Sequence, residues 1–118
     1  MTHSNVKRMD DIESGHLQEL RRGTVVVACL LILRTPDYGY ALLERLAAAG
    51  LVVDGNTLYP LLRRLEKQGL LTSEWNTDEA RPRKFYRTSS DGETLAGRLM
   101  QDWSDLTRTL HDIDGGTK

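Results

Sequence analysis

The feature of this 118-residue chain that most constrains its fold is a change of periodicity at Gly69. After this glycine, Leu71, Ser73 and Trp75 alternate with more polar residues up to Asn76, in the two-residue period of a half-buried strand. The chain then turns at Thr77–Ala80 and returns through a basic stretch, Arg81–Arg87. Before the glycine, leucines recur at the three-and-four spacing of one buried helix face. These leucines are Leu58, Leu61, Leu62 and Leu65. The order predicts a helix followed by a two-stranded hairpin.

Positive charge is confined to this same segment. From Arg63 to Arg87 there are seven basic and four acidic residues, a net charge of +3, while the rest of the chain carries −4. The formal charge of the whole chain, −1, argues against a protein that coats nucleic acid without sequence preference. A polar helix face followed by a basic hairpin is how a winged-helix domain meets duplex DNA. We therefore predict DNA binding, with ordinary solvated surface charge as the alternative.

Three further helices are expected around this segment. A first helix should begin near Asp11 or Ser14 and end before Pro36, and a second should begin at Thr35-Pro36-Asp37 and stop at Gly50. Asp54 or Asn56 should cap the leucine-rich helix, and Pro60 should make its first turn irregular. The last helix should open at Ser89 or Ser90, because Ser90 and Glu93 have the spacing of a capping box.

An apolar seam runs along this last helix. Its members alternate at spacings of three and four, as in a coiled coil, which predicts a homodimer; packing on its own domain is the alternative. The seam consists of Ala96, Leu99, Trp103, Leu106, Leu110 and Ile113. Periodicity alone favours plain core filling for Trp103, and an aromatic-lined gap for flat ligands is the alternative.

The predicted fold class is mainly α with a small β-hairpin (α+β): a winged helix-turn-helix with N- and C-terminal dimerisation helices. Four segments are expected. They are a disordered tail (1–10), a winged-helix DNA-binding domain (11–89), a C-terminal dimerisation helix (90–113) and a second disordered tail (114–118).

Other classes of function find little support. Ser104 and His111 would lie about two helical turns apart, beyond hydrogen-bond reach, so no catalytic pair forms and no enzyme is expected. Scattered histidines and the single Cys29 predict no metal site, no cofactor and no disulfide. The apolar run Val25–Leu33 is shorter than the roughly 18 residues that span a bilayer. We expect a cytoplasmic protein without a membrane partner.

Several motifs are similar to those of a known family. From about Gly23 to Leu110 the chain resembles the PadR family of bacterial transcriptional regulators, which are winged-helix dimers and mostly repressors. The resemblance rests on Tyr38-Gly39-Tyr40, Thr57-Leu58-Tyr59-Pro60-Leu61-Leu62, Arg64-Leu65-Glu66, Gly69-Leu70-Leu71, Arg83-Lys84-Phe85-Tyr86, Gly92 and Trp103. The chain departs from the family pattern at Thr88 and Ser89.

The resemblance implies roles for individual residues. The DNA-binding residues would be Tyr38, Asn56, Thr57, Tyr59, Pro60, Arg63 and Lys67 around the recognition helix, and Arg81, Arg83 and Lys84 on the wing. Trp103, with Leu99, would line a pocket for planar aromatic compounds at the dimer centre. The predicted function is a DNA-binding regulator: a repressor that binds a palindromic operator as a homodimer and is released by a small aromatic ligand. The alternative is a winged-helix module for protein contacts without DNA.

Overall fold

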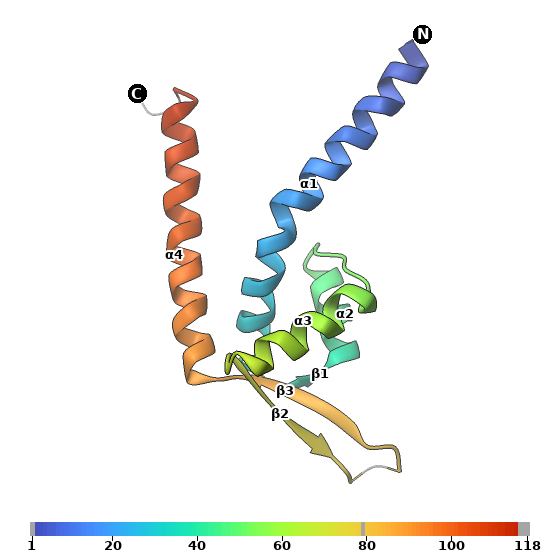
Figure 1. Ribbon diagram of the computed structural model, residues 1–118, viewed down its shortest axis with the longest axis vertical. Helices are drawn as coiled ribbons and strands as arrows, with labels where there is room; N and C mark the ends of the chain where they lie inside the picture. Colours follow the sequence, from blue (N-terminus) through green and yellow to red (C-terminus); the bar gives the residue numbers. More distant parts are fainter. Residues whose placement is uncertain (1, 79, 116–118) are drawn as a thin grey trace.

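The computed structural model describes residues 2–78 and 80–115 and consists of helices packed on a small sheet (Figure 1). The elements in chain order are α1 (Thr2–Ile32), β1 (Asp37–Tyr38), α2 (Gly39–Ala48), α3 (Gly55–Lys67), β2 (Leu71–Asn76), β3 (Arg83–Thr88) and α4 (Ser90–Ile113). The expected mixture of helices with a small antiparallel sheet, α+β, is confirmed. No helix in the described part of the chain is long and apolar enough to cross a membrane.

The core lies where the second half of α1 meets α2, α3 and the sheet. Leu58, Leu62 and Leu65 of α3 are buried as their spacing predicts, while Leu61 is only partly buried. They pack with Leu30 and other apolar residues of α1 and α2 in one cluster. Cys29 is buried in this cluster, and burial raises the pKa of its thiol to about 12, so the thiol stays protonated and inert.

The sheet has three strands rather than the two expected. β1 pairs antiparallel with β3, through Asp37 with Tyr86 and Tyr38 with Phe85, and the strand order is β1-β3-β2. The second helix therefore begins at Gly39, and the prediction of a start at Thr35-Pro36-Asp37 is wrong. A two-residue strand has no periodicity to detect, and it forms because β3 offers it a free edge.

The turns and caps around α3 follow local sequence signals. The Asp54 carboxylate accepts a hydrogen bond from the Thr57 amide at 2.9 Å, so Asp54, of the two candidates, is the cap. Gly50 and Gly69 both adopt positive φ, the left-handed conformation that ends a helix and favours glycine. Pro60 does not interrupt the helix, since α3 runs unbroken from Gly55. The expected irregular first turn is not observed.

Helix α1 corrects the prediction for the N-terminal tail. It begins at Thr2, so residues 2–10 are helical rather than disordered. The apolar spacing of Val6, Met9 and Ile12 continues the helical pattern of the residues that follow, a signal hidden by the polar residues between them. All three side chains are exposed in the single chain. At the other end, Asp114 and Gly115 form a helix cap and turn, and positions 116–118 of the second predicted tail lie outside the described residues.

Helix α4 begins against the body of the domain and then leaves it. Ser89, not Ser90, caps it, because its hydroxyl accepts from the Gly92 amide at 3.0 Å. A Cβ atom at Gly92 would lie 2.2 Å from the Leu70 carbonyl oxygen, so only glycine fits there. Thr88, where the chain departs from the family pattern, is buried and donates its hydroxyl to the Leu30 carbonyl at 2.6 Å.

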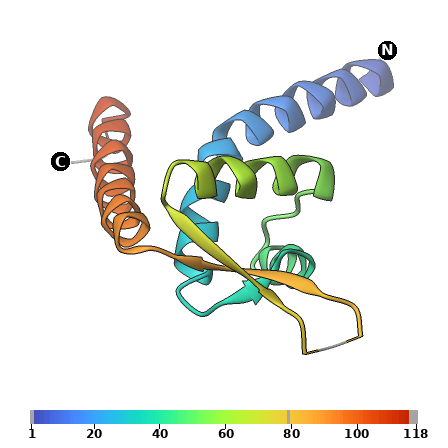
Figure 2. The ribbon, with the colours of Figure 1, turned by 60° about the horizontal axis from the view of Figure 1, so that its bottom comes forward.

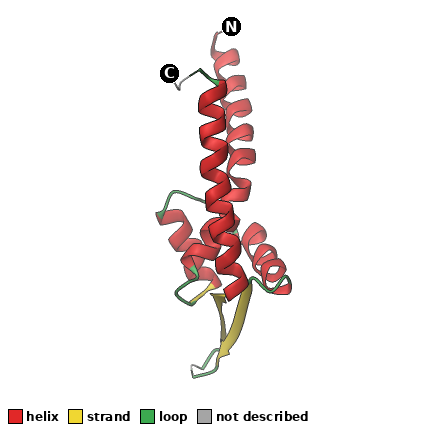
Figure 3. Ribbon diagram, turned by 90° about the vertical axis from the view of Figure 1, so that its left-hand side faces the viewer, coloured by secondary structure: helices red, strands yellow, loops and turns green. Residues whose placement is uncertain are grey.

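The two long helices project from the same side of the body. In Figure 1 their far ends spread apart at the top, while the β2–β3 hairpin points the opposite way. The side view in Figure 3 also has the ends of the long helices at the top and the hairpin at the bottom. The molecule therefore presents two separate surfaces: the long helices at one end, and α3 with the hairpin at the other.

Candidate nucleic-acid interface

Helix α3 presents a polar face to solvent. Asn56, Thr57 and Pro60 are exposed in its first half, and Arg63 and Lys67 are exposed in its second half. The face forms because the leucines turn the opposite side of the helix into the core. Figure 2 shows α3 above the β2–β3 hairpin, on the side turned to the viewer. The structure thus brings the predicted α3 residues together beside the hairpin.

Tyr59 differs from the other predicted residues of α3. Its side chain is only partly exposed and packs against the core. A Cβ atom at Gly39 would lie 2.6 Å from the Tyr59 ring, and one at Gly55 would lie 2.9 Å from it. The ring therefore fills the space between the first residues of α2 and α3, which only two glycines leave open. The Tyr59 ring therefore has a packing role, in which it joins α2 to α3.

The hairpin, which we call the wing (Leu71–Thr88), has two different faces. Paired residues of β2 and β3 point to the same side of a sheet, and neighbours along a strand point to opposite sides. Tyr86 and Thr88 are buried, which fixes their side as the inner face, toward α1 and α3. Lys84 alternates onto this inner face, whereas Arg83 and Arg87 lie on the outer face. Because Arg83 and Lys84 lie on opposite faces of the wing, they cannot both make the same kind of contact with one stretch of DNA backbone.

Arg83 is held by an aromatic cluster on the outer face. Its guanidinium carbon lies 5.3 Å from the centre of the Tyr38 ring and 5.2 Å from that of Tyr40, and these rings stack at 6.0 Å. The guanidinium also donates a hydrogen bond to the Tyr40 hydroxyl. Asn76 donates from Nδ2 to the Tyr38 hydroxyl at 2.8 Å. This cluster joins the wing to the start of α2.

Lys84 is held by an acidic partner on the inner face. Its ammonium lies 3.2 Å from a carboxylate oxygen of Glu66, in the last turn of α3, and 5.4 Å from the centre of the Tyr86 ring. Ser73 of β2 donates its hydroxyl to the same carboxylate. The Ser73 hydrogen bond and then Lys84 hold the pKa of Glu66 below its ordinary value. The group Glu66, Ser73 and Lys84 fixes the wing to α3.

Other basic residues of this region remain exposed. Within the part of the chain whose side chains the structure describes, five of them have no ion pair. These are Arg63, Arg64 and Lys67 on α3, Arg81 before β3, and Arg87 on the outer face of β3. Because they are exposed and not neutralised by a neighbouring acid, they supply the positive field of this surface.

The side chains that hold the wing in place were not predicted from the sequence. Tyr40, Asn76, Glu66 and Ser73 were not among the predicted site residues, and neither was the exposed Arg87. The two-residue alternation of β3 was a usable signal, since it separates Arg83 and Lys84 onto different faces. Nothing local in the sequence pairs Asn76 with Tyr38, because that contact depends on β1 joining the sheet.

The predicted dimer seam on α4 is exposed only beyond its first turns. Ala96 is fully buried in its own protomer and Leu99 is partly buried. Ala96 is thus unavailable to a partner, and its predicted dimer contact is replaced by packing on its own domain. Trp103 is 58% exposed, and the residues that continue the stripe are also exposed. They are Leu106, Leu110 and Ile113.

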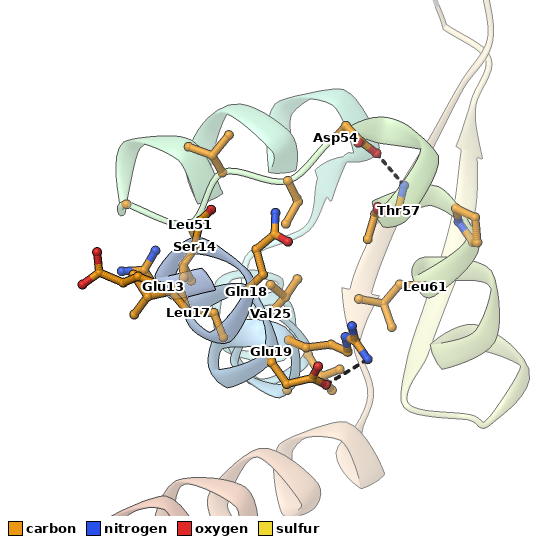
Figure 4. Close-up of a pocket in the computed structure, with 18 of the residues that line it drawn as sticks. Glu13, Ser14, Leu17, Gln18, Glu19, Val25, Leu51, Asp54, Thr57 and Leu61 are labelled. Atoms are coloured by element: carbon orange, nitrogen blue, oxygen red, sulfur yellow. Dashed lines mark hydrogen bonds and ion pairs between the residues drawn. The ribbon is translucent and has the colours of Figure 1, made fainter. Parts of the chain in front are cut away.

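A large groove in the described part of the chain is not the predicted aromatic-ligand site. It has a volume of about 1290 Å³ and lies between α1, the link Gly50–Asp54 and the first turns of α3 (Figure 4). Leu17, Leu51 and Leu61 point into it beside acidic side chains of α1. Neither Leu99 nor Trp103 lines it. Leu99 borders a hollow of about 450 Å³ on α4, whose lining residues do not include Trp103.

The sequence and the fold match known proteins closely. A helix-turn-helix followed by a wing defines the class of winged-helix DNA-binding regulators of transcription, which are not enzymes. Residues 29–98 match the model of the transcriptional regulator PadR-like family. The chain belongs to this PadR-like family.

Three individual relatives are similar to this chain in sequence, and two of them also in structure. A crystal structure of a PadR family transcriptional regulator from Eggerthella lenta is similar, with a TM-score of 0.87 and 46% identity over 91% of this chain and 96% of that one. A PadR-like transcription factor from Bacteroides fragilis has a TM-score of 0.70 and 34% identity, over 84% and 98% of the two chains. The transcriptional regulator Rv3488 of Mycobacterium tuberculosis is 35% identical over 79 residues, which are 67% of this chain and 71% of that protein.

Proposed function

We propose that this protein is a repressor that binds an inverted-repeat operator as a homodimer and is released by a small aromatic ligand. The observation that carries the proposal is the exposed polar and cationic face of α3 beside the wing. A winged helix places such a helix in the major groove and the wing on the adjacent backbone. Access to chromosomal DNA would require a cytoplasmic location.

The exposed residues of α3 divide by their chemistry. Asn56 and Thr57, at the start of the helix, can exchange hydrogen bonds with base edges, while Pro60 offers an apolar surface to them. Arg63, Lys67 and Arg81 would contact phosphates, and this fixes register rather than sequence. Arg83 and Lys84, together with Tyr38 and Tyr59, would support binding by holding α3 and the wing in place. With this assignment, the residues that would contact base edges all lie in the first two turns of α3.

The proposed dimer would bury the apolar residues that the single chain leaves exposed. On α4 these run from Met100 to Ile113, and on α1 they run from Val6 to Leu20. Exposed apolar residues along two projecting helices are costly in water unless a partner covers them. A two-fold axis lets the same surface cover its own copy, and two α3 helices related by that axis would match an inverted repeat if they lay about one DNA turn apart.

The proposed ligand would bind where two copies of Trp103 approach each other. Trp103 stands near the middle of α4, and Leu99 lies one turn before it. Two indole rings facing across an axis can stack on a flat aromatic molecule. Such a ligand would release DNA only if it favoured a dimer arrangement in which the α3 helices no longer fit two half-sites.

Selection of bound fragments from the source genome tests the central proposal. We expect an inverted repeat with half-sites about one turn apart, and a transcriptional reporter downstream of it should be silenced by the protein. Recovery of no repeat, or of single half-sites bound by a monomer, would contradict the proposal. For the ligand, quenching of tryptophan fluorescence by flat aromatic compounds should be lost in Trp103→Ala. Quenching that persists, from Trp75, would count against that site.

A further inference from the structure

We infer that Trp75 is a DNA-contacting residue of the wing, and that it binds the apolar part of the duplex, the deoxyribose surface at the edge of the minor groove. This inference rests on the proposed DNA binding and adds a contact that the predicted site did not contain. Trp75 is unusually exposed for a residue on this face of the wing. Trp75 lies on β2 and is 64% exposed, although the other residues of its face, Leu71 and Ser73, are buried or partly buried.

The strand register places Trp75 on the side of α3. Trp75 pairs with Lys84 across the hairpin, so both side chains lie on the inner face. Lys84 reaches Glu66 in the last turn of α3, which shows that this face of the wing looks toward that helix. Trp75 is level with Lys84 and stands one inner-face pair further toward the tip than Ser73, the other wing residue that meets Glu66 of α3. It is therefore positioned between the polar face of α3 and the wing tip, where a duplex bound by α3 would pass.

The surroundings of Trp75 favour an apolar contact over a phosphate contact. The nearest cation on its face, Lys84, is already neutralised by Glu66. Phosphates would be held instead by Arg81 at the tip and by Lys67 on α3, both exposed. A flat indole flanked by phosphate-binding residues matches the surface of a nucleic-acid backbone, in which sugars lie between the phosphates. In the described part of the chain Trp75 has no ring partner that would hold it for another purpose.

A contact between Trp75 and the sugars can be distinguished from two alternatives, a contact with a protein and a contact with phosphate. An exposed indole could also meet a second protein, but the exposed cations of the same segment, Arg81 on the wing and Lys67 on α3, favour a polyanionic partner. A contact with sugars buries apolar surface and releases no counterions, so its loss weakens binding without changing the salt dependence. Loss of a phosphate-binding residue changes both the affinity and its salt dependence. The two kinds of contact can therefore be distinguished by titration at several salt concentrations.

The experiment compares variants by anisotropy of a labelled operator duplex, recovered by the genomic selection described above. Trp75→Ala should weaken binding by about tenfold, the range of one lost aromatic contact to nucleic acid, with an unchanged salt slope. Thr72→Ala, on the same strand but on the outer face, should stay within about twofold of wild type, as expected for a surface change outside the contact. Equal losses in both variants, or a shallower slope in Trp75→Ala, would overturn the inference.

Fluorescence supplies a second measurement that does not depend on affinity. Addition of duplex should change the tryptophan emission of the wild-type protein and protect it from iodide, and the matched variant Trp75→Phe should lose most of this response while still binding DNA. A response that is the same in both proteins would overturn the inference. Failure of the wild-type protein itself to bind any selected duplex would instead overturn the proposed function, so the two failures are distinguishable.

Discussion

Helix α3 and the Arg83–Lys84 motif of strand β3 both carry positive charge, but the basic side chains of α3 are exposed whereas those of the motif are engaged by neighbouring residues. On α3, Arg63 and Lys67 are exposed and have no ion pair in the part of the chain described. On β3, Arg83 is stacked on two tyrosines and Lys84 is paired with Glu66. The basic motif of the wing is therefore mainly structural, whereas the less conspicuous cations of α3 are free to neutralise a polyanion.

This difference shows that a cluster of charge in a sequence does not by itself locate a binding site. A cation contributes to the field felt by a ligand according to its exposure and its existing partners. Lys84 is already compensated by a carboxylate about 3.2 Å away, and that contact would have to be exchanged for any phosphate contact. Four measurements test the contrast between the cations of α3 and those of β3.

The largest expected effect is in the double variant Arg63→Ala with Lys67→Ala. If each side chain neutralises one phosphate, binding should weaken by about tenfold per lost contact near 0.1 M salt, and the log-log salt slope should become shallower by about 0.9 per contact. Stability should change little, because both residues are exposed and alanine is a good helix former. Fluorescence anisotropy with a labelled duplex measures both quantities.

A control for this variant carries the same change of charge elsewhere. Arg98→Ala with Arg108→Ala removes two cations from α4, which projects away from α3 and the wing. Its salt slope should match that of the wild type. Equal slopes in all three proteins would contradict the role assigned to α3.

Arg83→Ala tests the aromatic cluster of the wing. It removes two cation–π contacts at a partly exposed site, so the free energy of unfolding should fall by about 1 to 2 kcal/mol. Arg83→Lys keeps the charge but not the planar group that stacks on both rings, so it should restore little of that stability. Urea unfolding followed by circular dichroism measures the free energy of unfolding of each variant. Full recovery of stability in the lysine variant would show that charge, rather than stacking, is what the cluster uses.

The elements predicted well are those specified by neighbours in sequence. Asp54 caps α3, Gly50 and Gly69 end helices through positive φ, and α4 runs over the expected residues 90–113. Each of these depends on one side chain or one backbone conformation within a few residues. The leucine face of α3 was equally readable, because helical spacing decides which side is buried.

The elements predicted poorly depend on contacts between distant residues. β1 exists only because β3 presents an edge to Asp37 and Tyr38. Tyr59 was expected on the solvent face, yet its ring fills the gap left by Gly39 and Gly55, which are distant from each other along the chain. Neither fact has a local signature. The opposite faces of Arg83 and Lys84 were readable from strand alternation, but only once the buried side of β3 is known.

Lys84→Ala tests the ion pair of the wing, with a smaller effect. Both partners are partly exposed, so the free energy of unfolding should fall by about 1 kcal/mol or less. The salt slope of DNA binding should stay at the wild-type value, whereas Arg81→Ala should make it shallower by about 0.9. Anisotropy titrations of the two variants give the comparison directly. A slope reduced equally in both would place Lys84 on the phosphates and remove the contrast between α3 and β3.

The smallest effect concerns the pH dependence of the same group. The Ser73 hydroxyl and Lys84 hold the pKa of Glu66 below its ordinary value of 4.5. A carboxylate whose pKa is lowered by folding adds stability above the ordinary value, and this stability is lost as the pH falls through the folded pKa. The melting temperature of wild type should therefore exceed that of Glu66→Gln at neutral pH, and the difference should shrink as the pH falls below 4.5. Ser73→Ala, which removes the largest cause of the shift, should narrow this pH-dependent difference even though Lys84 remains. If the difference between wild type and Glu66→Gln were constant from pH 7 to pH 3, ionised Glu66 would contribute nothing to the wing, and Lys84 would be available for phosphate after all.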